Sequence, residues 1–146
     1  MNRPIVKFCR LPHGQGLPLP AYETAGAAGM DLRAAEPWTI EALGTAAIRT
    51  GFNIEISAGY EGQVRLRSSV GRQGLIIPNA PGTIDSDYRG EIVMVLRNLT
   101  LDKIRIERGH RLAQLVIAPV ARSEIVEVEK LTETARGAGG FGSTGV

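Results

Sequence analysis

Glycine and proline recur along the whole chain and cut it into short segments. The 146 residues include 18 glycines and eight prolines, and no segment between them shows the capped, 3.6-residue apolar period of a helix longer than about 12 residues. Most segments instead alternate apolar and polar residues or are rich in β-branched side chains, as strands are. They are residues 5–9, 46–56, 63–67, 91–96, 103–107, 112–120 and 123–128. Such spacing, with turns between the strands, is typical of an antiparallel sandwich or barrel.

The length favours one all-β domain, a distorted antiparallel β-barrel or jelly-roll-like fold with at most one short helix. The helix candidate begins at Ser68 or Ser69, whose hydroxyl can cap a first turn over residues 70–73. Residues 91–96 are almost wholly apolar, which predicts a strand covered on both faces. Residues 132–146 contain five glycines and little that can be buried. We therefore expect a β-barrel domain of residues 1–131 and a flexible Gly-rich C-terminal segment of residues 132–146.

Charge and composition exclude several classes of function. A net charge of +2 is too small for a protein that binds nucleic acid mainly through its phosphates, and seven aromatic residues are too few for a base-stacking platform. No stretch has the ~18 apolar residues of a membrane span, and the N-terminus does not resemble a signal peptide. A single cysteine, Cys9, excludes an internal disulfide and a cysteine-built zinc site. We expect a cytoplasmic protein.

The densest polar cluster is residues 79–91, which we expect to form a long hairpin. An amide at Asn79 can hydrogen-bond a flat ligand, and Gly82 lets that ligand approach the backbone. A carboxylate beside a bound phosphate can hold and deprotonate a water. Asp85 and Asp87 both lie at the hairpin tip, and the residues alone do not decide between them. An ordinary β-turn would also explain the tip, but it does not require Tyr88.

Two further motifs carry groups that suit a phosphate ligand. Arg67, Ser68 and Ser69 combine an arginine fork, two hydroxyls and the start of a short helix, although helix capping alone would explain the serines. Asp31 lies between apolar neighbours near the start of a strand, where it either caps a turn or faces a hydrated Mg²⁺. The glycines and hydroxyls of the tail suit phosphate oxygens, and an aromatic residue there, Phe141, can close over a base. A plain flexible end is the alternative.

In order and spacing, five motifs resemble those of the trimeric all-β dUTP diphosphatases, the dUTPases, along essentially the whole chain. They are residues 28–32, 67–69, 79–90, 109–114 and 136–145. The resemblance implies Mg²⁺-assisted hydrolysis of dUTP to dUMP and pyrophosphate, which keeps uracil out of DNA and supplies dUMP for thymidylate synthesis. It also implies a homotrimer in which one chain gives each site its hairpin, a second the phosphate motifs and a third the tail.

The resemblance assigns a role to each matching residue. Asp85 would activate the water that attacks the α-phosphorus, Tyr88 would pack beneath the deoxyribose and exclude a 2′-hydroxyl, and Asp31 would reach the metal through water. The uracil would be read by Asn79 with the backbone around Gly82, Thr83, Ile84 and Val93. The phosphate chain would be held by Arg67, Ser68, Ser69 and Gln114, and the lid would be formed by Arg136, Phe141, Ser143 and Thr144.

The sequence departs from the family pattern at two positions. Ser69 replaces a common glycine, so its side chain can crowd a backbone N–H that faces phosphate, and His110 replaces a common acid. Two other interpretations stay open. One is a dCTP deaminase-like enzyme, which needs an additional acid at the base ring. The other is a non-catalytic trimeric β module that binds nucleic acid or protein, suggested by the pI near 9.0. On the main interpretation the partners are dUTP and two further copies of the chain, with no nucleic acid and no membrane.

Overall fold

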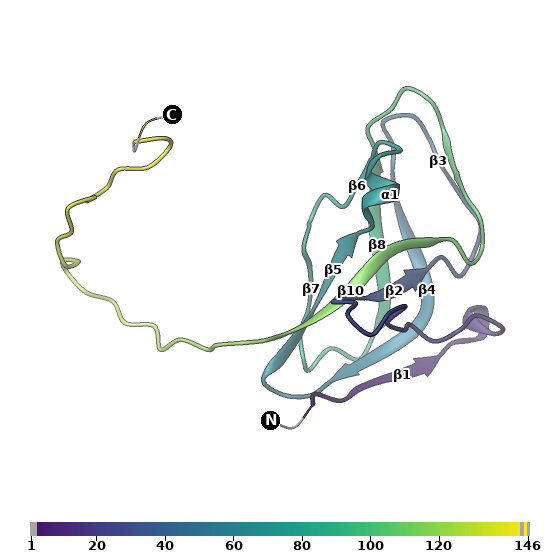
Figure 1. Cartoon of the computed structure of the whole chain (residues 1–146), viewed down its shortest axis with the longest axis horizontal. Coiled ribbons are helices and arrows are strands. Elements are labelled where there is room, and N and C mark those ends of the chain that lie inside the picture. Colours follow the sequence, from purple (N-terminus) through teal and green to yellow (C-terminus); the bar gives the residue numbers. More distant parts are fainter. Residues whose placement is uncertain (1–2, 144, 146) are drawn as a thin grey trace.

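Two four-stranded antiparallel sheets and a two-stranded ribbon form the body of the protein (Figure 1). The computed structural model describes residues 3–143 and 145. The first sheet has the order β1-β4-β8-β6, formed by β1 (Val6–Arg10), β4 (Thr45–Ile56), β8 (Glu91–Asn98) and β6 (Leu75–Ile76). The second has the order β2-β10-β5-β7, formed by β2 (Met30–Arg33), β10 (Arg111–Pro119), β5 (Tyr60–Leu66) and β7 (Gly82–Ile84). The ribbon pairs β3 (Trp38–Ile40) with β9 (Ile104–Ile106).

One apolar core lies between the two sheets. Alternate residues of β8, Ile92, Met94 and Leu96, are buried together with Leu32 of β2 and Leu115 of β10. This alternation is the period-two pattern of strands with one covered face. The all-β prediction is confirmed, although the sheets pack as a sandwich and do not close into a continuous barrel.

The short helix is found where it was expected, but not with the predicted cap. Helix α1 (Ser68–Gly71) begins at Ser68, and its N-cap residue is Arg67 without a side-chain cap hydrogen bond. The N–H groups of Val70 and Gly71 bond instead to the carbonyl of Arg67. Because the backbone satisfies this turn, both serine side chains stay exposed. Apart from a 3-10 turn, η1 (Pro12–Gly14), residues 3–143 contain no other helix.

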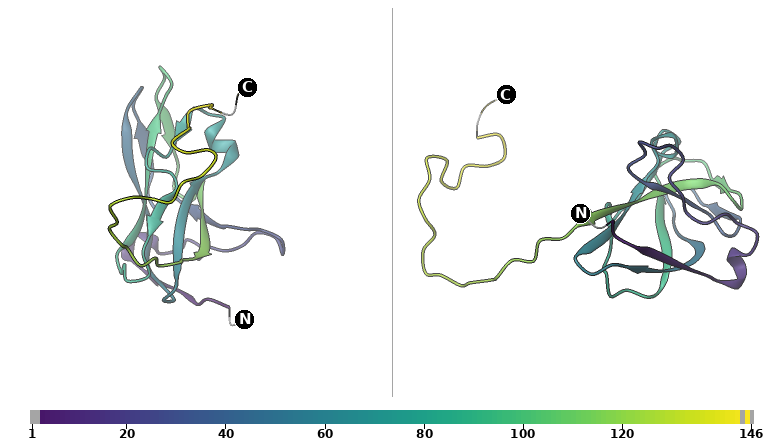
Figure 2. Two further views of the ribbon diagram at one scale, coloured as in Figure 1. Left: turned by 90° about the vertical axis from the view of Figure 1, so that its left-hand side faces the viewer. Right: turned by 60° about the horizontal axis from the view of Figure 1, so that its bottom comes forward.

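Two strand predictions are wrong. Residues 123–128 form no strand, and Ile125 is 96% exposed, because the chain leaves the body after β10 and has no neighbouring strand to pair with (Figures 1 and 2). Strand β8 is covered on one face only, since Val93 is 39% exposed. Its uncovered face lines a pocket. No helix within residues 3–143 is long and apolar enough to cross a membrane.

Candidate functional site

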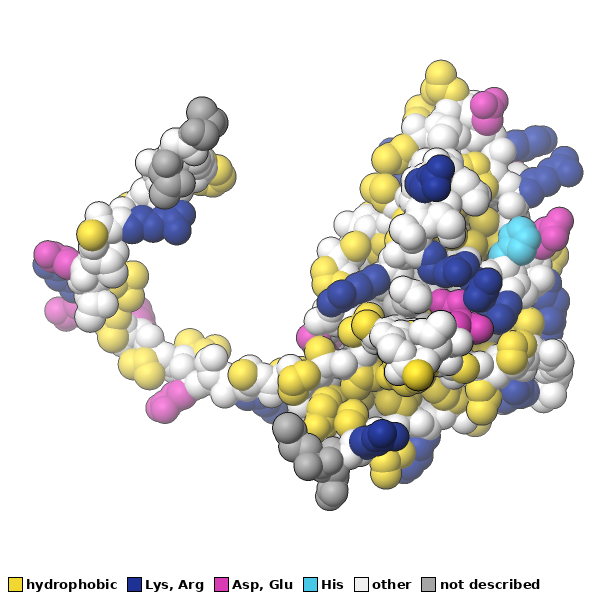
Figure 3. Space-filling model, in the orientation of Figure 1, with side chains coloured by type: hydrophobic (Ala, Val, Ile, Leu, Met, Phe, Trp, Pro, Cys, Tyr) yellow, Lys and Arg dark blue, Asp and Glu magenta, His cyan; other side chains and the backbone are white. Residues whose placement is uncertain are grey.

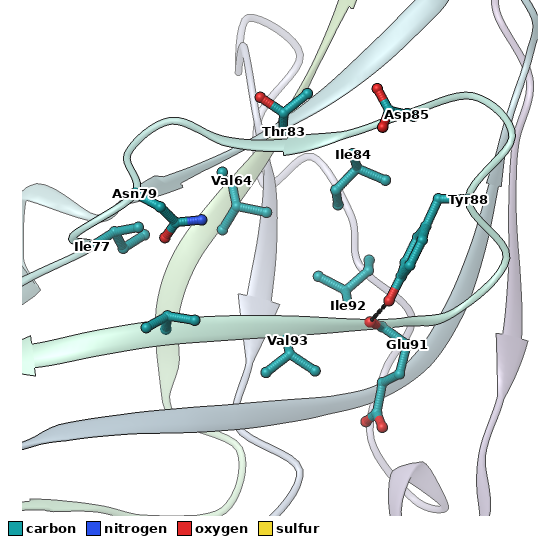
Figure 4. A pocket seen from close by; sticks show the side chains of 12 residues that line it. Val64, Ile77, Asn79, Thr83, Ile84, Asp85, Tyr88, Glu91, Ile92 and Val93 are labelled. Carbon is teal, nitrogen blue, oxygen red and sulfur yellow. Dashed lines mark hydrogen bonds between the residues drawn. The ribbon is translucent and has the colours of Figure 1, made fainter.

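A pocket of about 250 Å³ opens between the hairpin that carries β7 and the strand β8 (Figure 4). The face of β8 that is not covered by the core forms one wall of this pocket. Its lining comprises Val64, Ile77, Asn79, Gly82, Thr83, Ile84, Asp85, Tyr88, Glu91, Ile92, Val93 and Val95. The structure thus brings together every residue assigned to the base, the sugar and the attacking water.

The amide of Asn79 lies against the backbone of β7. A Cβ atom at Gly82 would meet Val64 Cβ at 3.3 Å and Asn79 Nδ2 at 3.5 Å, so a side chain at this position would fill the space that the amide faces. Gly82 pairs with Val64 of β5, which fixes this wall to the second sheet. An exposed amide beside a glycine backbone can form hydrogen bonds with the polar edge of a flat ligand.

The Tyr88 ring forms one side of the pocket, and Gly90 allows it to lie there. Its hydroxyl donates to the carbonyl of Glu91 at 2.8 Å (Figure 4). A Cβ at Gly90 would lie 2.4 Å from that hydroxyl oxygen, so any side chain would displace the ring. The sequence analysis gave Gly90 no role, although its place two residues after the tyrosine could have suggested this one.

Asp85 lies on the rim of the pocket, whereas Asp87 does not line it. Thr83 and Asp85 extend from one side of β7 and Ile84 from the other (Figure 4), so Ile84 is buried while the carboxylate of Asp85 is exposed. An exposed carboxylate on the rim can accept a proton from a water bound above the pocket. Asp85 lines this pocket and Asp87 does not, although both acids line a neighbouring hollow.

Glu91, below the Tyr88 ring, has an anchored carboxylate. Burial raises the pKa of Glu91, but hydrogen bonds from His13, the Gly51 N–H and Arg49, together with the charge of His13, outweigh it and leave the pKa below its ordinary value. The two carboxylate oxygens contact His13 Nε2 at 2.6 Å and Arg49 Nε at 2.9 Å. No sequence motif predicted a role for Glu91.

A second cluster surrounds Asp31 on the second sheet. Arg111 Nη1 contacts the Asp31 carboxylate at 3.0 Å, Gln114 Nε2 donates to it at 3.1 Å, and Arg67 Nε lies 3.6 Å away. Figure 3 shows basic side chains around acidic ones on the face where β2, β10 and α1 lie. Asp31 itself is 4% exposed. Its carboxylate holds these side chains in place, and Arg111 is a member of the cluster for which the sequence motifs predicted no role.

The residues around Asp31 fit a metal ion that is bound mainly by substrate phosphates and by water. Within residues 3–143 and 145, no group of three or more His, Cys, Asp or Glu side chains is placed to hold a metal ion. Asp31 is a single carboxylate with an arginine and an amide already on its oxygens. Mg²⁺ commonly keeps several waters and binds one carboxylate together with substrate phosphates. A single carboxylate of this kind suits a hydrated Mg²⁺ bound to a triphosphate. It does not suit a metal ion held entirely by protein side chains.

The expected parts of the site do not meet within one chain. Arg67, Ser69 and Arg111 line a separate hollow beside α1 that has no residue in common with the pocket. The tail runs away from both (Figures 1 and 2).

In the described part of the tail, Arg136 Nε bonds to the carbonyl of Gly139 at 2.8 Å, and Phe141 is fully exposed. Ser143 is also exposed. Thr144 lies outside the described residues.

The sequence model of the dUTPase family matches residues 16–145. The chain belongs to the dUTPase family. It is 58% identical to the deoxyuridine 5′-triphosphate nucleotidohydrolase of Rhizobium meliloti, over 99% of this chain and 96% of that one. The protein of the same name from Brucella melitensis is 55% identical, over 99% and 95%.

Solved dUTPases have the same fold. The dUTPase of Staphylococcus bacteriophage 80alpha with dUpNHpp superimposes with a TM-score of 0.89 at 29% identity, covering 97% of this chain and 99% of that one. A mutant dUTPase of phage phi11, described as coordinating a structural Mg(II) ion, has a TM-score of 0.78 at 25% identity, covering 86% and 97%. Within this dUTPase chain, the pocket, the Asp31 cluster and the tail correspond to separate sequence motifs.

Proposed function

We propose that the protein hydrolyses dUTP to dUMP and pyrophosphate. The observation that carries the proposal is the pocket of a dUTPase-family chain in which one hairpin presents an amide, a tyrosine ring and a rim carboxylate. Asn79 would pair with the polar edge of uracil above Gly82, opposite Val93. The ring of Tyr88 would lie against the sugar, where a 2′-hydroxyl would collide with it. Release of dUMP in place of dUTP would lower the uracil available to DNA synthesis.

We further propose that the active site is shared among three copies of the chain. The pocket and the hollow with Arg67 and Ser69 have no common lining residue, and the described residues from 134 onward make hydrogen bonds only among themselves. A homotrimer would bring the hairpin of one chain to the phosphate motifs of another and the tail of a third. Residues 1–131 would then form the trimeric body and residues 132–146 the lid.

The chemistry needs positioning and neutralisation of charge. Oxygen of the attacking water would bond to the α-phosphorus as the bond to the bridging oxygen breaks and pyrophosphate leaves. Asp85 would hold that water and take its proton, an effect of about 10²–10⁴ in rate. The phosphate chain would be held by Arg67, Ser68 and Ser69. Arg111 and Gln114, which Asp31 positions, would also hold it. Mg²⁺ bound on the triphosphate would supply further neutralisation of negative charge.

The lid would complete this site after the substrate binds. Arg136 and the hydroxyls of Ser143 and Thr144 would contact the terminal phosphate, and Phe141 would cover the base. The described tail extends away from the body (Figures 1 and 2) and its aromatic side chain is exposed, so it is free to order on a neighbouring subunit. Closing a site in this way excludes bulk water.

The test is release of pyrophosphate from dUTP, dTTP, dCTP and UTP, each with Mg²⁺ and with a chelator. We expect metal-dependent release from dUTP alone, by a protein that light scattering shows to be a trimer. Ammonia release from dCTP would instead indicate a deaminase. A clean trimer that acts on none of the four nucleotides would contradict the proposal and indicate a binding module.

A further inference from the structure

The pairing of β4 with β8 is interrupted directly beneath the pocket. Arg49 pairs with Val93, and the next pair is Asn53 with Glu91, so residues 50–52 of β4 lie opposite Ile92 alone. Gly51 in this bulge has a φ of +80°, a conformation that favours glycine. Regular ladder pairing is therefore missing opposite Ile92, although Asn53 still pairs with Glu91 and the N–H of Ile54 donates to the carbonyl of Gly90 at 3.2 Å.

Side chains replace the missing ladder. Thr50 Oγ1 donates to the carbonyl of Ile92 at 2.7 Å, and the N–H of Gly51 donates to Glu91 Oε1 at 2.8 Å. Glu91 also receives Arg49 Nε on its other oxygen at 2.9 Å. Its side chain, only 12% exposed, thus binds the bulge of β4 at two points. A charge-assisted hydrogen bond is stronger than the neutral one that it replaces.

A third contact to Glu91 comes from outside the sheet. His13 Nε2 in the turn η1 lies 2.6 Å from Glu91 Oε1, and the imidazole is 16% exposed. The turn reaches this place because Gly14 packs on Gly51, where a Cβ on Gly14 would lie 2.4 Å from the carbonyl oxygen of Gly51. The glycine pair thereby lets His13 reach the carboxylate from the side opposite the pocket hairpin.

The backbone of Glu91 bears the acceptor for the sugar-contacting ring. The hydroxyl of Tyr88 donates to the Glu91 carbonyl at 2.8 Å. We propose that Glu91, clamped by His13 and Arg49, is a positioning residue that fixes the Tyr88 ring and thereby sets the selectivity of the pocket against a 2′-hydroxyl. This inference rests on the proposed function, since it assigns the ring to the sugar of a deoxynucleotide.

A substitution at Glu91 keeps the backbone carbonyl that accepts the Tyr88 hydroxyl. It removes the side-chain contacts that hold this part of the backbone to β4. In Glu91→Ala the Gly51 N–H, His13 and Arg49 all lose their acceptor, so the first residues of β8 can shift together with the Tyr88 hydroxyl. Glu91→Gln keeps one oxygen for the Gly51 N–H but loses the charge that holds Arg49. The effect on selectivity should therefore be graded, and it should appear in the ribose-to-deoxyribose ratio more than in kcat for dUTP.

The experiment measures that ratio in two ways for the full-length protein. One is kcat/KM for dUTP against UTP, and the other is Kd for dUMP against UMP by calorimetry, which does not require turnover. In Glu91→Ala we expect both ratios to fall about tenfold, mainly through a lowered KM and Kd for the ribonucleotides, because a displaced ring no longer excludes the 2′-hydroxyl, and in Glu91→Gln by about threefold. His13→Gln, which removes one contact of the clamp, should change them in the same direction.

Glu41→Gln is the matched control. Glu41 is exposed in the turn between β3 and β4 and does not line the pocket, so its substitution should leave both ratios unchanged. A Glu91→Ala protein that is folded and trimeric yet keeps wild-type ratios overturns the inference. If that variant does not fold, unchanged ratios in both Glu91→Gln and His13→Gln overturn it. A wild-type protein that prefers dUMP to UMP but does not hydrolyse dUTP would instead refute the proposed function.

Discussion

Gln114 of β10 lies directly opposite Asp31 of β2, and its amide donates to the Asp31 carboxylate at 3.1 Å. Arg111 contacts the other oxygen of the same carboxylate at 3.0 Å. Two motifs that are about 80 residues apart in the sequence thus form one polar cluster across a single strand pair. Its buried carboxylate holds an arginine and an amide in place, which would lower the cost of ordering them on the proposed phosphate ligand.

Asp31→Asn should destabilise the protein. The substitution leaves the guanidinium of Arg111 and the nearby Arg67 without their counter-charge, and we expect the free energy of unfolding to fall by about 1–3 kcal/mol. Urea denaturation at a fixed protein concentration measures this, because assembly makes stability depend on concentration. Glu23→Gln is the control, since Glu23 lies 3.9 Å from Arg111 and is 48% exposed, and it should cost less than about 0.5 kcal/mol. Equal effects of the two substitutions would contradict the anchoring role.

Asp85→Asn should abolish most turnover while substrate binding is kept. An amide can still orient water but cannot accept its proton, so kcat should fall by about 10²–10⁴. Steady-state pyrophosphate release measures kcat, and calorimetry with dUpNHpp measures binding. Asp87→Asn, on the same hairpin but away from the pocket lining, is expected to retain kcat within about threefold. A larger loss in Asp87→Asn than in Asp85→Asn would reverse the assignment.

Gly90→Ala should weaken binding of dUTP without unfolding the protein. The added methyl would overlap the Tyr88 hydroxyl, at 2.4 Å, and an overpacked site relieves strain of about 1–3 kcal/mol by moving side chains. Because the ring is 43% exposed, it can swing outward, so we expect KM for dUTP to rise about tenfold with a nearly unchanged melting temperature. Gly26→Ala tests the loss of a glycine by itself, because a Cβ there meets no atom within 4 Å and its φ is not positive. An unaltered KM in Gly90→Ala would show that the ring position does not matter.

Deletion of residues 136–146 should leave the trimer intact and reduce catalysis severely. The described part of this tail makes no hydrogen bond to the body, so its removal exposes no core and should not change the melting temperature. We expect at least a tenfold loss in kcat/KM for dUTP because Arg136 and Phe141 can no longer close the site. Light scattering and pyrophosphate release measure the two properties. Near-normal turnover of the shortened protein would contradict the lid.

Acid should destabilise the protein partly through Glu91. The pKa of Glu91 in the folded chain lies below the ordinary value of 4.5, so the folded state favours the ionised form. That contribution is present above pH 4.5 and is lost as the pH falls through the folded-state pKa. Urea titrations between about pH 5 and 3 should therefore show a shallower loss of stability in Glu91→Gln than in the wild type. Identical slopes in the two proteins would contradict the carboxylate's role.

Local pattern decided much of the fold. The short alternating segments between glycines and prolines become strands such as β4, β8 and β10, since period-two burial is a property of neighbouring residues. The start of α1 at Ser68 and the clustering of Asn79, Asp85 and Tyr88 in one hairpin are also local, because the turn-forming residues among them fold this segment back on itself. The resemblance to the family motifs assigns roles to these residues but does not give their positions relative to one another.

Tertiary structure decided the features that join distant residues. Whether residues 123–128 form a strand depends on a partner strand, and within the described chain none lies beside them. The covered and open faces of β8 follow from which sheet lies across from it, and the packing of the hairpin on β8 places Asp85 but not Asp87 in the pocket lining. The clamp of Glu91 by His13 arises because Gly14 packs on Gly51, a contact between η1 and β4 that no local periodicity encodes. Sequence determines which groups are available, and long-range packing determines which of them meet.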